Sequence, residues 1–468
     1  MDDALQRDID AYLDEHWEDV VADIDSLVRV ESVEDLDAAR EGAPYGPGPR
    51  QALSRALEIA DRMGLQTHDC EGYLGYADLP GESETQIGII GHVDVVPAGT
   101  GWRFEPYAVS RRDGYLLGRG VVDDKGPIMV ALHAVKFWAD RGQVLPYTVR
   151  VLFGSNEETN MKDVGYYRAH YEDPAFLFTP DSQFPVGYGE SGICSGSLES
   201  PCFEGGDILE FSGGQAVNAV PAAAQALVRC NGIPQASEGV VVESCGNGLF
   251  RVQAAGVAAH ASTPELGRNA IGVLVDYLRT CQLGTPEEKR FLELMHALFA
   301  TDDGSGLGVA CSDEHFGALT AVGGIAEMRD GRIVQSIDFR YPTTITSAEI
   351  ERRVNEAAAR AGARFAMEHD KEPFLMDPQS PAVRALLDAY NAATGEQREG
   401  VTSKGGTYAR MFSVGVSFGV EKPWESDPDW VGGMHGPDEG VREDLLKQAF
   451  AIYARTIGNL MQLDLDEL

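Results

Sequence analysis

The sequence contains two histidines and four carboxylates whose types and spacing suit the binding of metal ions. These residues are His92, Asp123, Glu157, Glu158, Asp181 and His435. Imidazole and carboxylate donors without a thiolate favour borderline or hard divalent ions such as Zn, Mn and Co. A two-metal site needs one bridging carboxylate and, for each ion, one imidazole and one further carboxylate. Five of the six side chains can fill these roles, which leaves one glutamate of the adjacent pair free to act as a base.

The first of these histidines is ambiguous on its own. His92 follows the apolar run 86–90, which predicts a buried strand, and Asp94 comes two residues later. A carboxylate that accepts the second ring N–H of a ligating histidine fixes its tautomer and raises its basicity. A histidine near the end of a strand is nevertheless more often a structural residue, so the metal interpretation depends on the other candidates.

Three predicted strands end next to candidate ligands. They cover residues 86–90, 147–153 and 175–179. Helical segments lie between them, and the clearest is predicted over 128–139. Alternating strands and helices predict a mainly parallel α/β sheet, whose binding sites lie at the carboxyl ends of the strands. The positions of the candidate ligands agree with this rule.

The pattern changes in the middle of the chain, where glycine-punctuated segments with alternating polarity predict further strands. Helices are predicted between them, near 269–281, 287–299 and 347–361. The α/β pattern then resumes and ends with a predicted helix over 443–460. We therefore predict a discontinuous α/β catalytic domain with a mainly parallel mixed sheet, formed by residues 1–190 and 377–468. An inserted α+β lid domain over residues 191–376 interrupts it.

The composition narrows the choice of partners and location. A chain of 468 residues is expected to form two or three domains. The 38 Lys and Arg against 74 Asp and Glu give a net charge of −36, which disfavours nucleic acid and anionic membranes as partners. No apolar run approaches the roughly 18 residues that span a bilayer. Seven cysteines without a CxxC pair, and an N-terminus without signal-peptide features, predict a cytoplasmic protein.

Six short motifs occur along the chain: GHVDVVP, GRGVVDDKGP, NEET, TPD, AAHAS and GMHGPDE. Together they resemble the di-metal aminoacylase/carboxypeptidase/dipeptidase metallopeptidase family, which includes acetylornithine deacetylase, succinyl-diaminopimelate desuccinylase and the carnosinases. The resemblance covers essentially the whole chain. Its length and long insert are most similar to those of the PepV-type bacterial dipeptidases. The resemblance implies a zinc-peptidase-like catalytic domain that carries two divalent ions, with Zn expected and Mn or Co as alternatives.

The resemblance also assigns the metal ligands by motif position. His92 and Asp181 would hold one ion, and Glu158 and His435 would hold the other. Asp123 would bridge the two ions.

Two further residues of this domain receive roles from the family. Glu157 would be the general base and acid that assists attack by a hydroxide bridging the ions. Asp94 would orient His92. The peptide bond between Asp123 and Asp124 is cis in relatives.

The inserted domain would complete the site. By resemblance, His260 would stabilise the oxyanion, Arg340 would bind the carboxylate of the substrate through its planar fork, and Asn218 would contact the same carboxylate. Judged without the family, His260 could be a structural residue and Arg340 a charge on a strand surface. Gly405 is predicted to line the substrate cleft, and Lys404 stands before it where a smaller residue is expected.

These features predict a metallopeptidase that cleaves the peptide bond of dipeptides, with β-alanyl dipeptides as a possible substrate class. An N-acyl-amino-acid deacylase is the alternative, because it uses the same metal ions and base. A free amine requires a carboxylate partner and an acyl group an apolar pocket, and the sequence does not show which is present. A non-catalytic peptide binder would require a broken ligand set, whereas all six positions are intact. A monomer is expected because the long insert imitates a dimer within one chain, and a homodimer is the alternative.

Overall fold

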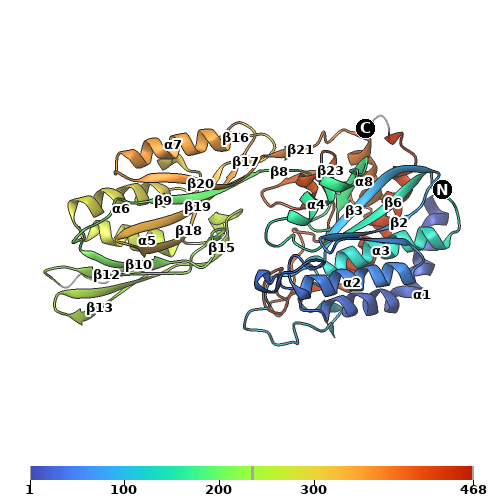
Figure 1. The fold of residues 1–468 in the computed structure, drawn as a ribbon, viewed down its shortest axis with the longest axis horizontal. Helices are drawn as coiled ribbons and strands as arrows, with labels where there is room; N and C mark the ends of the chain where they lie inside the picture. The colour runs from blue at the N-terminus through green and yellow to red at the C-terminus, as the bar shows by residue number, and fades with distance from the viewer. Residues whose placement is uncertain (1, 233–236, 466–468) are drawn as a thin grey trace. The chain divides into compact units, whose positions relative to one another are not determined.

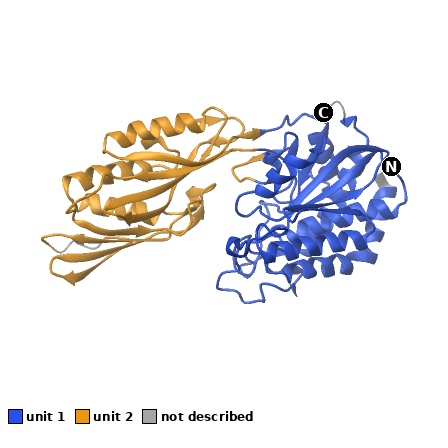
Figure 2. Cartoon of the chain, in the orientation of Figure 1, with its two compact units in different colours: residues 1–189, 375–401, 407–468 blue, residues 190–374, 402–406 orange. Residues whose placement is uncertain are grey.

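The structure is a computed structural model that describes residues 2–232 and 237–465 (Figure 1). Its internal contacts divide the chain into two compact units, shown in different colours in Figure 2. Unit 1 comprises Met1–Gly189, Leu375–Val401 and Thr407–Leu468, and unit 2 comprises Glu190–Phe374 and Thr402–Gly406. The boundaries predicted from the sequence place 402–406 in the catalytic domain, whereas the contacts group this short segment with unit 2.

Unit 1 is built on a mixed sheet whose central strands are parallel. The strand order is β1 (Gln66–Cys70), β2 (Leu74–Leu79), β6 (Tyr147–Gly154), β3 (Ser83–His92), β7 (Phe176–Thr179), β23 (Gly415–Ser417), β8 (Gly187–Glu190) and β21 (Phe374–Leu375), and β22 (Val401–Ser403) also pairs with β8. Strands β6, β3, β7 and β23 run parallel to one another. Their carboxyl ends therefore lie along one edge of the sheet.

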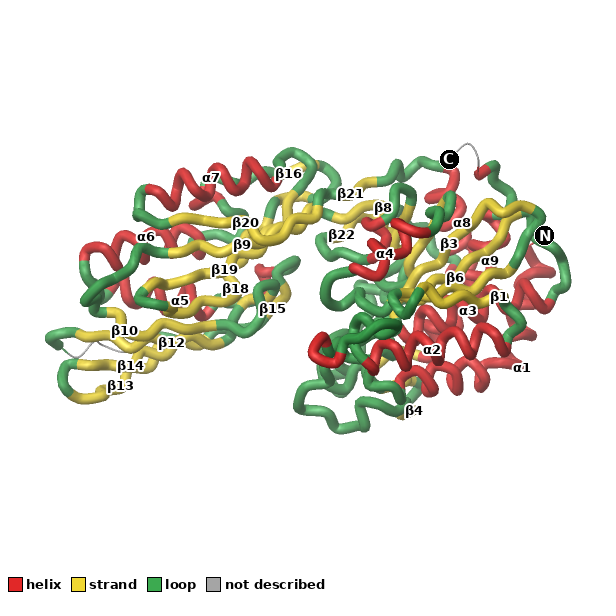
Figure 3. The backbone as a smooth tube through the Cα atoms, in the orientation of Figure 1, coloured by secondary structure: helices red, strands yellow, loops and turns green. Residues whose placement is uncertain are grey.

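Helices pack around this sheet (Figures 1 and 3). They are α1 (Asp2–Val28), α2 (Pro47–Arg62), α3 (Lys125–Asp140), α4 (Lys162–His170), α8 (Pro381–Thr394) and α9 (Glu443–Leu460), with short 3₁₀ turns η1 (Leu36–Ala38) and η4 (Tyr408–Met411). A small sheet has the order β24 (Gly440–Arg442), β5 (Tyr115–Leu117) and β4 (Ser110–Arg112). No helix in the described part of the chain is both long and apolar enough to cross a membrane.

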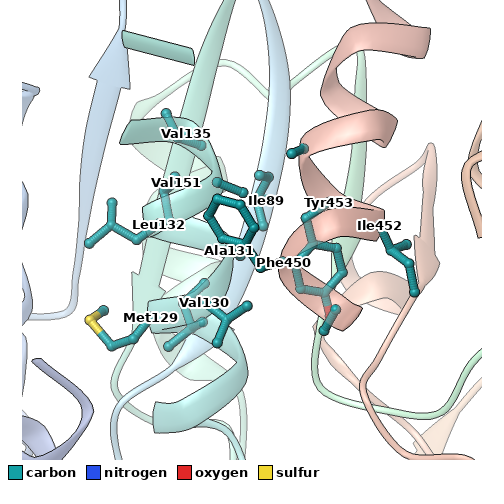
Figure 4. Close-up of a cluster of buried hydrophobic side chains, with 14 of the residues drawn as sticks. Ile89, Met129, Val130, Ala131, Leu132, Val135, Val151, Phe450, Ile452 and Tyr453 are labelled. Carbon is teal, nitrogen blue, oxygen red and sulfur yellow. The ribbon is translucent and has the colours of Figure 1, made fainter. Parts of the chain in front are cut away.

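The core of unit 1 forms between the sheet and helices α3 and α9, as Figure 4 shows. The side chains drawn there come from strands β3 and β6 and from both helices, and include Ile89, Met129, Val130, Ala131, Leu132, Val135, Val151, Phe450, Ile452 and Tyr453. Full burial of one large apolar side chain contributes about 1.5–3 kcal/mol. Helix α3 begins at Lys125 rather than at the predicted residue 128. Pro127 fits in its first turn because the N–H groups there need no partner within the helix.

Unit 2 is an antiparallel sheet covered by helices. The strand order is β13 (Val240–Gly246), β14 (Leu249–Ala255), β12 (Ala223–Arg229), β10 (Ile208–Gly213), β18 (Thr320–Arg329), β19 (Arg332–Tyr341), β9 (Gly192–Glu199) and β20 (Arg364–Lys371). The helices are α5 (Ala270–Thr280), α6 (Pro286–Phe299) and α7 (Ser347–Ala359), with short turns η2 (Pro264–Leu266) and η3 (Ser305–Leu307). Two small ribbons pair β11 (Ala219–Val220) with β15 (Ala259–His260) and β16 (Ser312–Asp313) with β17 (Gly317–Ala318). The predicted fold class, an α/β domain with an α+β insert, is confirmed.

Candidate metal centre

The candidate ligands of unit 1 gather at the carboxyl edge of its parallel strands. His92 is the last residue of β3, the adjacent glutamates follow β6, and Asp181 follows β7. Asp123 lies in the loop before α3, and His435 lies in the loop before β24. The structure thus brings together side chains that are up to 343 positions apart in the sequence.

Asp123 lies at the centre of this cluster. Its Oδ1 is 2.9 Å from Nε2 of His92, which is 3.7 Å from Oδ2 of Asp181. Its Oδ2 is 3.0 Å from Nε2 of His435, which is 2.9 Å from Oε2 of Glu158. The donor atoms within each group of three lie within 4.8 Å of one another. Two three-residue groups therefore share one carboxylate, each of whose oxygens faces a different group.

The ionisable groups of this cluster influence one another's pKa values. Hydrogen bonds to Asp123 and Glu158 raise the pKa of His435 to about 11. Burial would lower the pKa of His92, but its contacts with Asp123 and Asp94 raise it well above its ordinary value. Burial and the charge of Asp123 raise the pKa of Asp181 to about 7. Buried carboxylates of this kind attract any available positive charge, whether protons on the imidazoles or metal ions.

The two adjacent glutamates differ in how they are held. Oε1 of Glu158 accepts a hydrogen bond from the backbone N–H of Val96 at 3.2 Å, and its Oε2 faces His435. The Glu157 carboxylate makes no hydrogen bond or ion pair with any residue in 2–232 or 237–465. Burial and the charge of Asp181 raise the pKa of Glu157 well above its ordinary value. One glutamate is thus fixed in the cluster, and its neighbour remains available to a reacting group.

Asp94 lies beside His92, and its backbone comes nearer to the ring than its carboxylate does. Its carbonyl oxygen, not its carboxylate, lies at hydrogen-bond distance from Nδ1 of His92, at 3.0 Å, while Oδ1 is 3.6 Å away. The carboxylate instead accepts hydrogen bonds from the backbone N–H groups of Glu157 and Glu158, at 3.3 and 3.2 Å. These two donors engage both carboxylate oxygens, while Oδ1 also lies within ion-pair distance of the His92 ring. Asp94 therefore positions the glutamate pair as well as the histidine ring.

The second aspartate of the Asp123–Asp124 pair supports the histidine from another side. The peptide bond between the two residues is cis. Oδ2 of Asp124 accepts a hydrogen bond from the backbone N–H of His92 at 3.1 Å. A Cβ atom on Gly91 would lie 2.1 Å from this oxygen, so the glycine of the GHVD motif leaves the space that the carboxylate fills.

Glu439 is a supporting residue that the sequence reasoning missed. Its side chain is completely buried and accepts hydrogen bonds from the backbone N–H groups of Gly120 and Val122, at 2.9 and 3.1 Å, and from the guanidinium of Arg119. Burial and the charge of Asp123 raise its pKa to about 7. This contact ties the loop that carries Asp123 to the segment that carries His435. The available signal was its place as the last residue of the GMHGPDE motif.

Asp163 supports the loop that leads to the glutamates. It is completely buried and accepts hydrogen bonds from the backbone N–H groups of Ser155 and Asn156, at 2.8 and 3.2 Å. It also accepts one from the hydroxyl of Tyr408. Burial raises the pKa of Asp163 to about 6 despite these donors. The sequence shows this residue only as an acidic position at the start of α4.

Two of the predicted residues of unit 2 lie next to each other. His260 in β15 pairs with Ala219 in β11, and the carbonyl oxygen of Asn218 accepts a hydrogen bond from Ala261 N–H at 2.9 Å. The side chains of both His260 and Asn218 are exposed. Nδ1 of His260 accepts a hydrogen bond from the backbone N–H of Ser262 at 3.2 Å, which places the ring proton of the neutral imidazole on Nε2. The Nε2–H group of His260 can therefore donate a hydrogen bond to a negatively charged oxygen.

Arg340, the third predicted residue of unit 2, is buried rather than a charge on a strand surface. Its Nε and Nη2 donate to the two carboxylate oxygens of Asp338, at 2.7 and 3.2 Å, and its Nη1 donates to the carbonyl oxygen of Lys404 at 3.1 Å. Arg340 is 5% exposed and Asp338 is 4% exposed. Much of the guanidinium fork is therefore already occupied. Nζ of Lys404 donates to the carbonyl oxygen of Ala318 at 2.8 Å.

Replacing only one member of this buried pair is expected to destabilise unit 2. Arg340→Met leaves Asp338 as an unpaired buried charge, which should cost about 3–5 kcal/mol of unfolding free energy. Adding Asp338→Asn should recover most of this loss. Urea unfolding followed by circular dichroism measures both variants. An equal loss in the single and double variants would show that the ion pair is not the source of the effect.

Comparison with known sequences identifies the family. The profile of Peptidase family M20/M25/M40 matches residues 88–459. The chain belongs to this family of peptidases. It is 31% identical over 464 residues to the protein named "Putative dipeptidase YtjP" from Bacillus subtilis, with 95% of this chain and 97% of the relative covered. It is also 31% identical over 467 residues to "Putative dipeptidase SH1171" from Staphylococcus haemolyticus, with 94% and 97% covered.

Solved structures show the same fold at low sequence identity. Human carnosine dipeptidase 1 is 16% identical, with a TM-score of 0.59, and the match covers 98% of this chain and 99% of that one. The di-peptidase Dug1p from Saccharomyces cerevisiae is 13% identical, with a TM-score of 0.61, and the match covers 99% and 100%. The architecture of the whole chain is thus shared with these proteins.

Proposed function

We propose that the protein hydrolyses dipeptides with two divalent ions held by five side chains of unit 1. His92 and Asp181 would hold one ion, Glu158 and His435 the other, and Asp123 would bridge them. The observation that carries this proposal is the arrangement of Asp123, each of whose carboxylate oxygens faces one imidazole at 2.9 or 3.0 Å. The names of the relatives, which describe dipeptidases, support the same reaction.

The donor set fits such ions. It consists of imidazole nitrogens and carboxylate oxygens, which suit Zn and also Mn or Co. Bound divalent ions would polarise the scissile carbonyl group and lower the pKa of water toward neutrality. We propose Zn as the resident metal.

Glu157 would carry the proton during the reaction. Its carboxylate is held next to the cluster by the backbone contact of Glu157 with Asp94, and it has no partner among the described residues. In this proposal it takes a proton from the attacking water and transfers it to the nitrogen of the leaving amine, whose bond to the carbonyl carbon breaks. The same group thus serves first as base and then as acid.

Unit 2 would supply the groups that contact the substrate. We propose that Nε2–H of His260 donates to the developing oxyanion, since Nδ1 is already engaged by Ser262. Arg340 and Asn218 would bind the carboxylate of the substrate. The pairing of Arg340 with Asp338 supports a fixed guanidinium, because an Arg side chain held by a carboxylate loses little freedom on binding.

An activity panel tests this function. Protein stripped with a chelator and reloaded with Zn, Mn or Co should cleave dipeptides such as Ala-Ala and β-Ala-Ala faster than N-acetyl-alanine. The stripped protein should be inactive until metal is added. A preference for N-acetyl-alanine would favour an N-acyl-amino-acid deacylase instead. Inactivity of every metal-loaded form on both substrate classes would reject the proposal.

Metal binding is expected to release protons near neutral pH. In the metal-free protein the raised pKa values of His92 and His435 keep both imidazoles protonated, whereas a metal ion requires the neutral rings. Binding of two ions should release about two protons, so the affinity should rise from pH 6 to pH 8. Titration calorimetry in two buffers of different ionisation enthalpy measures the number of protons released. Identical heats in both buffers would contradict the expected proton release.

The location and assembly of the protein are also proposals. All seven cysteines are free thiols, which supports a reducing compartment such as the cytoplasm. We propose a monomer, because the inserted unit adds a long lid to a single chain. Light scattering that shows a stable dimer would overturn this assembly.

A further inference from the structure

A cavity of about 190 Å³ lies within unit 1, at the carboxyl edge of its sheet. Charged and polar side chains form much of its wall. Its lining includes Val122, Gln183, Glu421, Lys422, Glu425 and Arg442.

This cavity adjoins the chain segments that carry two of the candidate ligands. Val122 directly precedes Asp123, and Gln183 follows Asp181 by two residues. The segment after β23 runs beside the segment after β7, because these strands are parallel. Within these segments Gln183 and Glu421 form a β-bridge, and Phe184 N–H donates to the carbonyl oxygen of Glu421 at 2.8 Å. Glu421 therefore lies at the same edge of the sheet as Asp181.

The other charged groups of the cavity wall already have partners. Nζ of Lys422 is 3.1 Å from Oε1 of Glu396. Nη2 of Arg442 is 2.7 Å from Oε2 of Glu425. Both cations are thus neutralised by carboxylates other than Glu421.

Glu421 is different. Its carboxylate makes no hydrogen bond or ion pair with any residue that the structure describes, and the residue is partly buried. Burial and the charge of Asp123 raise its pKa to about 7. A partly buried carboxylate without a partner loses some hydration without gaining a contact, so a cationic group that enters the cavity would be stabilised there.

We propose that Glu421 binds an ammonium group of the substrate's N-terminal residue and so makes the enzyme specific for substrates with a free amine. This inference rests on the proposed hydrolase function and decides between its two substrate classes. An N-acyl substrate would bring a neutral amide to this carboxylate and leave it without a cation. Sites that require a polar partner reject analogues that lack it far more strongly than apolar pockets reject a changed methylene.

The ammonium group could come from two positions on the substrate. It could be the α-amine of Ala-Ala or the β-amine of β-Ala-Ala. Both offer the same chemistry to Glu421, and N-acylation removes the charge of either amine. The substrate whose kcat/KM falls most when the charge of Glu421 is removed identifies the amine that Glu421 binds.

The test compares Glu421→Gln with the wild-type protein loaded with Zn. We expect kcat/KM to fall by about 10–100-fold for the preferred amine substrate, as for loss of one charge-assisted hydrogen bond, and to change less than about threefold for N-acetyl-alanine. Glu399→Gln is a matched control, because this exposed glutamate of unit 1 lies outside the cavity wall. Metal content and melting temperature should match the wild type in both variants.

Failure of the Glu421 proposal can be distinguished from failure of the proposed hydrolase function. Unchanged kcat/KM for both amine substrates, or an equal fall for N-acetyl-alanine, would overturn the role of Glu421. If the wild-type protein cleaves nothing, the proposed function fails and the ammonium site is tested by calorimetry with alaninamide. Weaker binding of alaninamide to Glu421→Gln would then support the site, and equal binding to both proteins would reject it.

Discussion

Glu157→Gln is expected to lower kcat by about 10²–10⁴-fold while both metal ions remain bound, since this range is typical for loss of a general base. Glu157 belongs to neither three-residue group, so its charge can be removed without removing a donor from either one. Glutamine keeps the shape and cannot accept the proton. Steady-state kinetics with Ala-Ala and elemental analysis of the same preparation measure the two effects together.

Glu158→Gln is the matched control for this prediction. The substitution is the same and lies one residue away, but Oε2 of Glu158 is 2.9 Å from Nε2 of His435 and faces the second group. This variant should therefore lose metal as well as activity. If the Glu157→Gln variant loses metal, Glu157 is a ligand rather than the base. If it keeps more than about a tenth of wild-type kcat, another group carries the proton.

The fold and the ligand positions could be predicted from the sequence because both depend on local patterns. Apolar runs mark β3, β6 and β7, and polar residues directly after them must lie at one edge once the strands are parallel. Glu157 and Glu158 lie in a turn rather than in an extended segment, so strand geometry does not explain why their side chains differ. One of these carboxylates accepts a hydrogen bond from Val96 N–H, and the other has no partner among the described residues.

The supporting contacts could not be predicted, because they depend on backbone groups that the sequence does not place. The carboxylate of Asp94 lies 3.6 Å from Nδ1 of His92, and it also accepts hydrogen bonds from the N–H groups of two residues more than sixty positions away. Glu439 accepts from N–H groups on the loop before α3, more than three hundred positions away. Asp338 lies two residues from Arg340 on the same strand, and only the structure shows that their side chains pair. Each partner is defined by loop conformation rather than by spacing.

Asp123→Asn is expected to abolish the binding of both metal ions. The residue is 6% exposed and its two oxygens serve different groups, so an amide removes a negative charge and one acceptor from a position that both ions would share. Loss of a group that only supports a ligand typically costs 10–100-fold in metal affinity or activity, so the loss of this shared ligand should cost more than about 100-fold. Asp113→Asn, at an exposed turn, is the matched control.

The comparison with His435→Ala distinguishes a bridging ligand from a terminal one. His435 belongs to one group only, so its removal should leave close to one metal equivalent at His92, Asp181 and Asp123. Elemental analysis after dialysis should then give close to zero metal equivalents per chain for Asp123→Asn, close to one for His435→Ala and two for Asp113→Asn. One equivalent in Asp123→Asn would mean that each ion has its own carboxylates and that Asp123 bridges nothing. Two metal equivalents in His435→Ala would show that the second ion binds without this imidazole, and His435 would then not be a ligand.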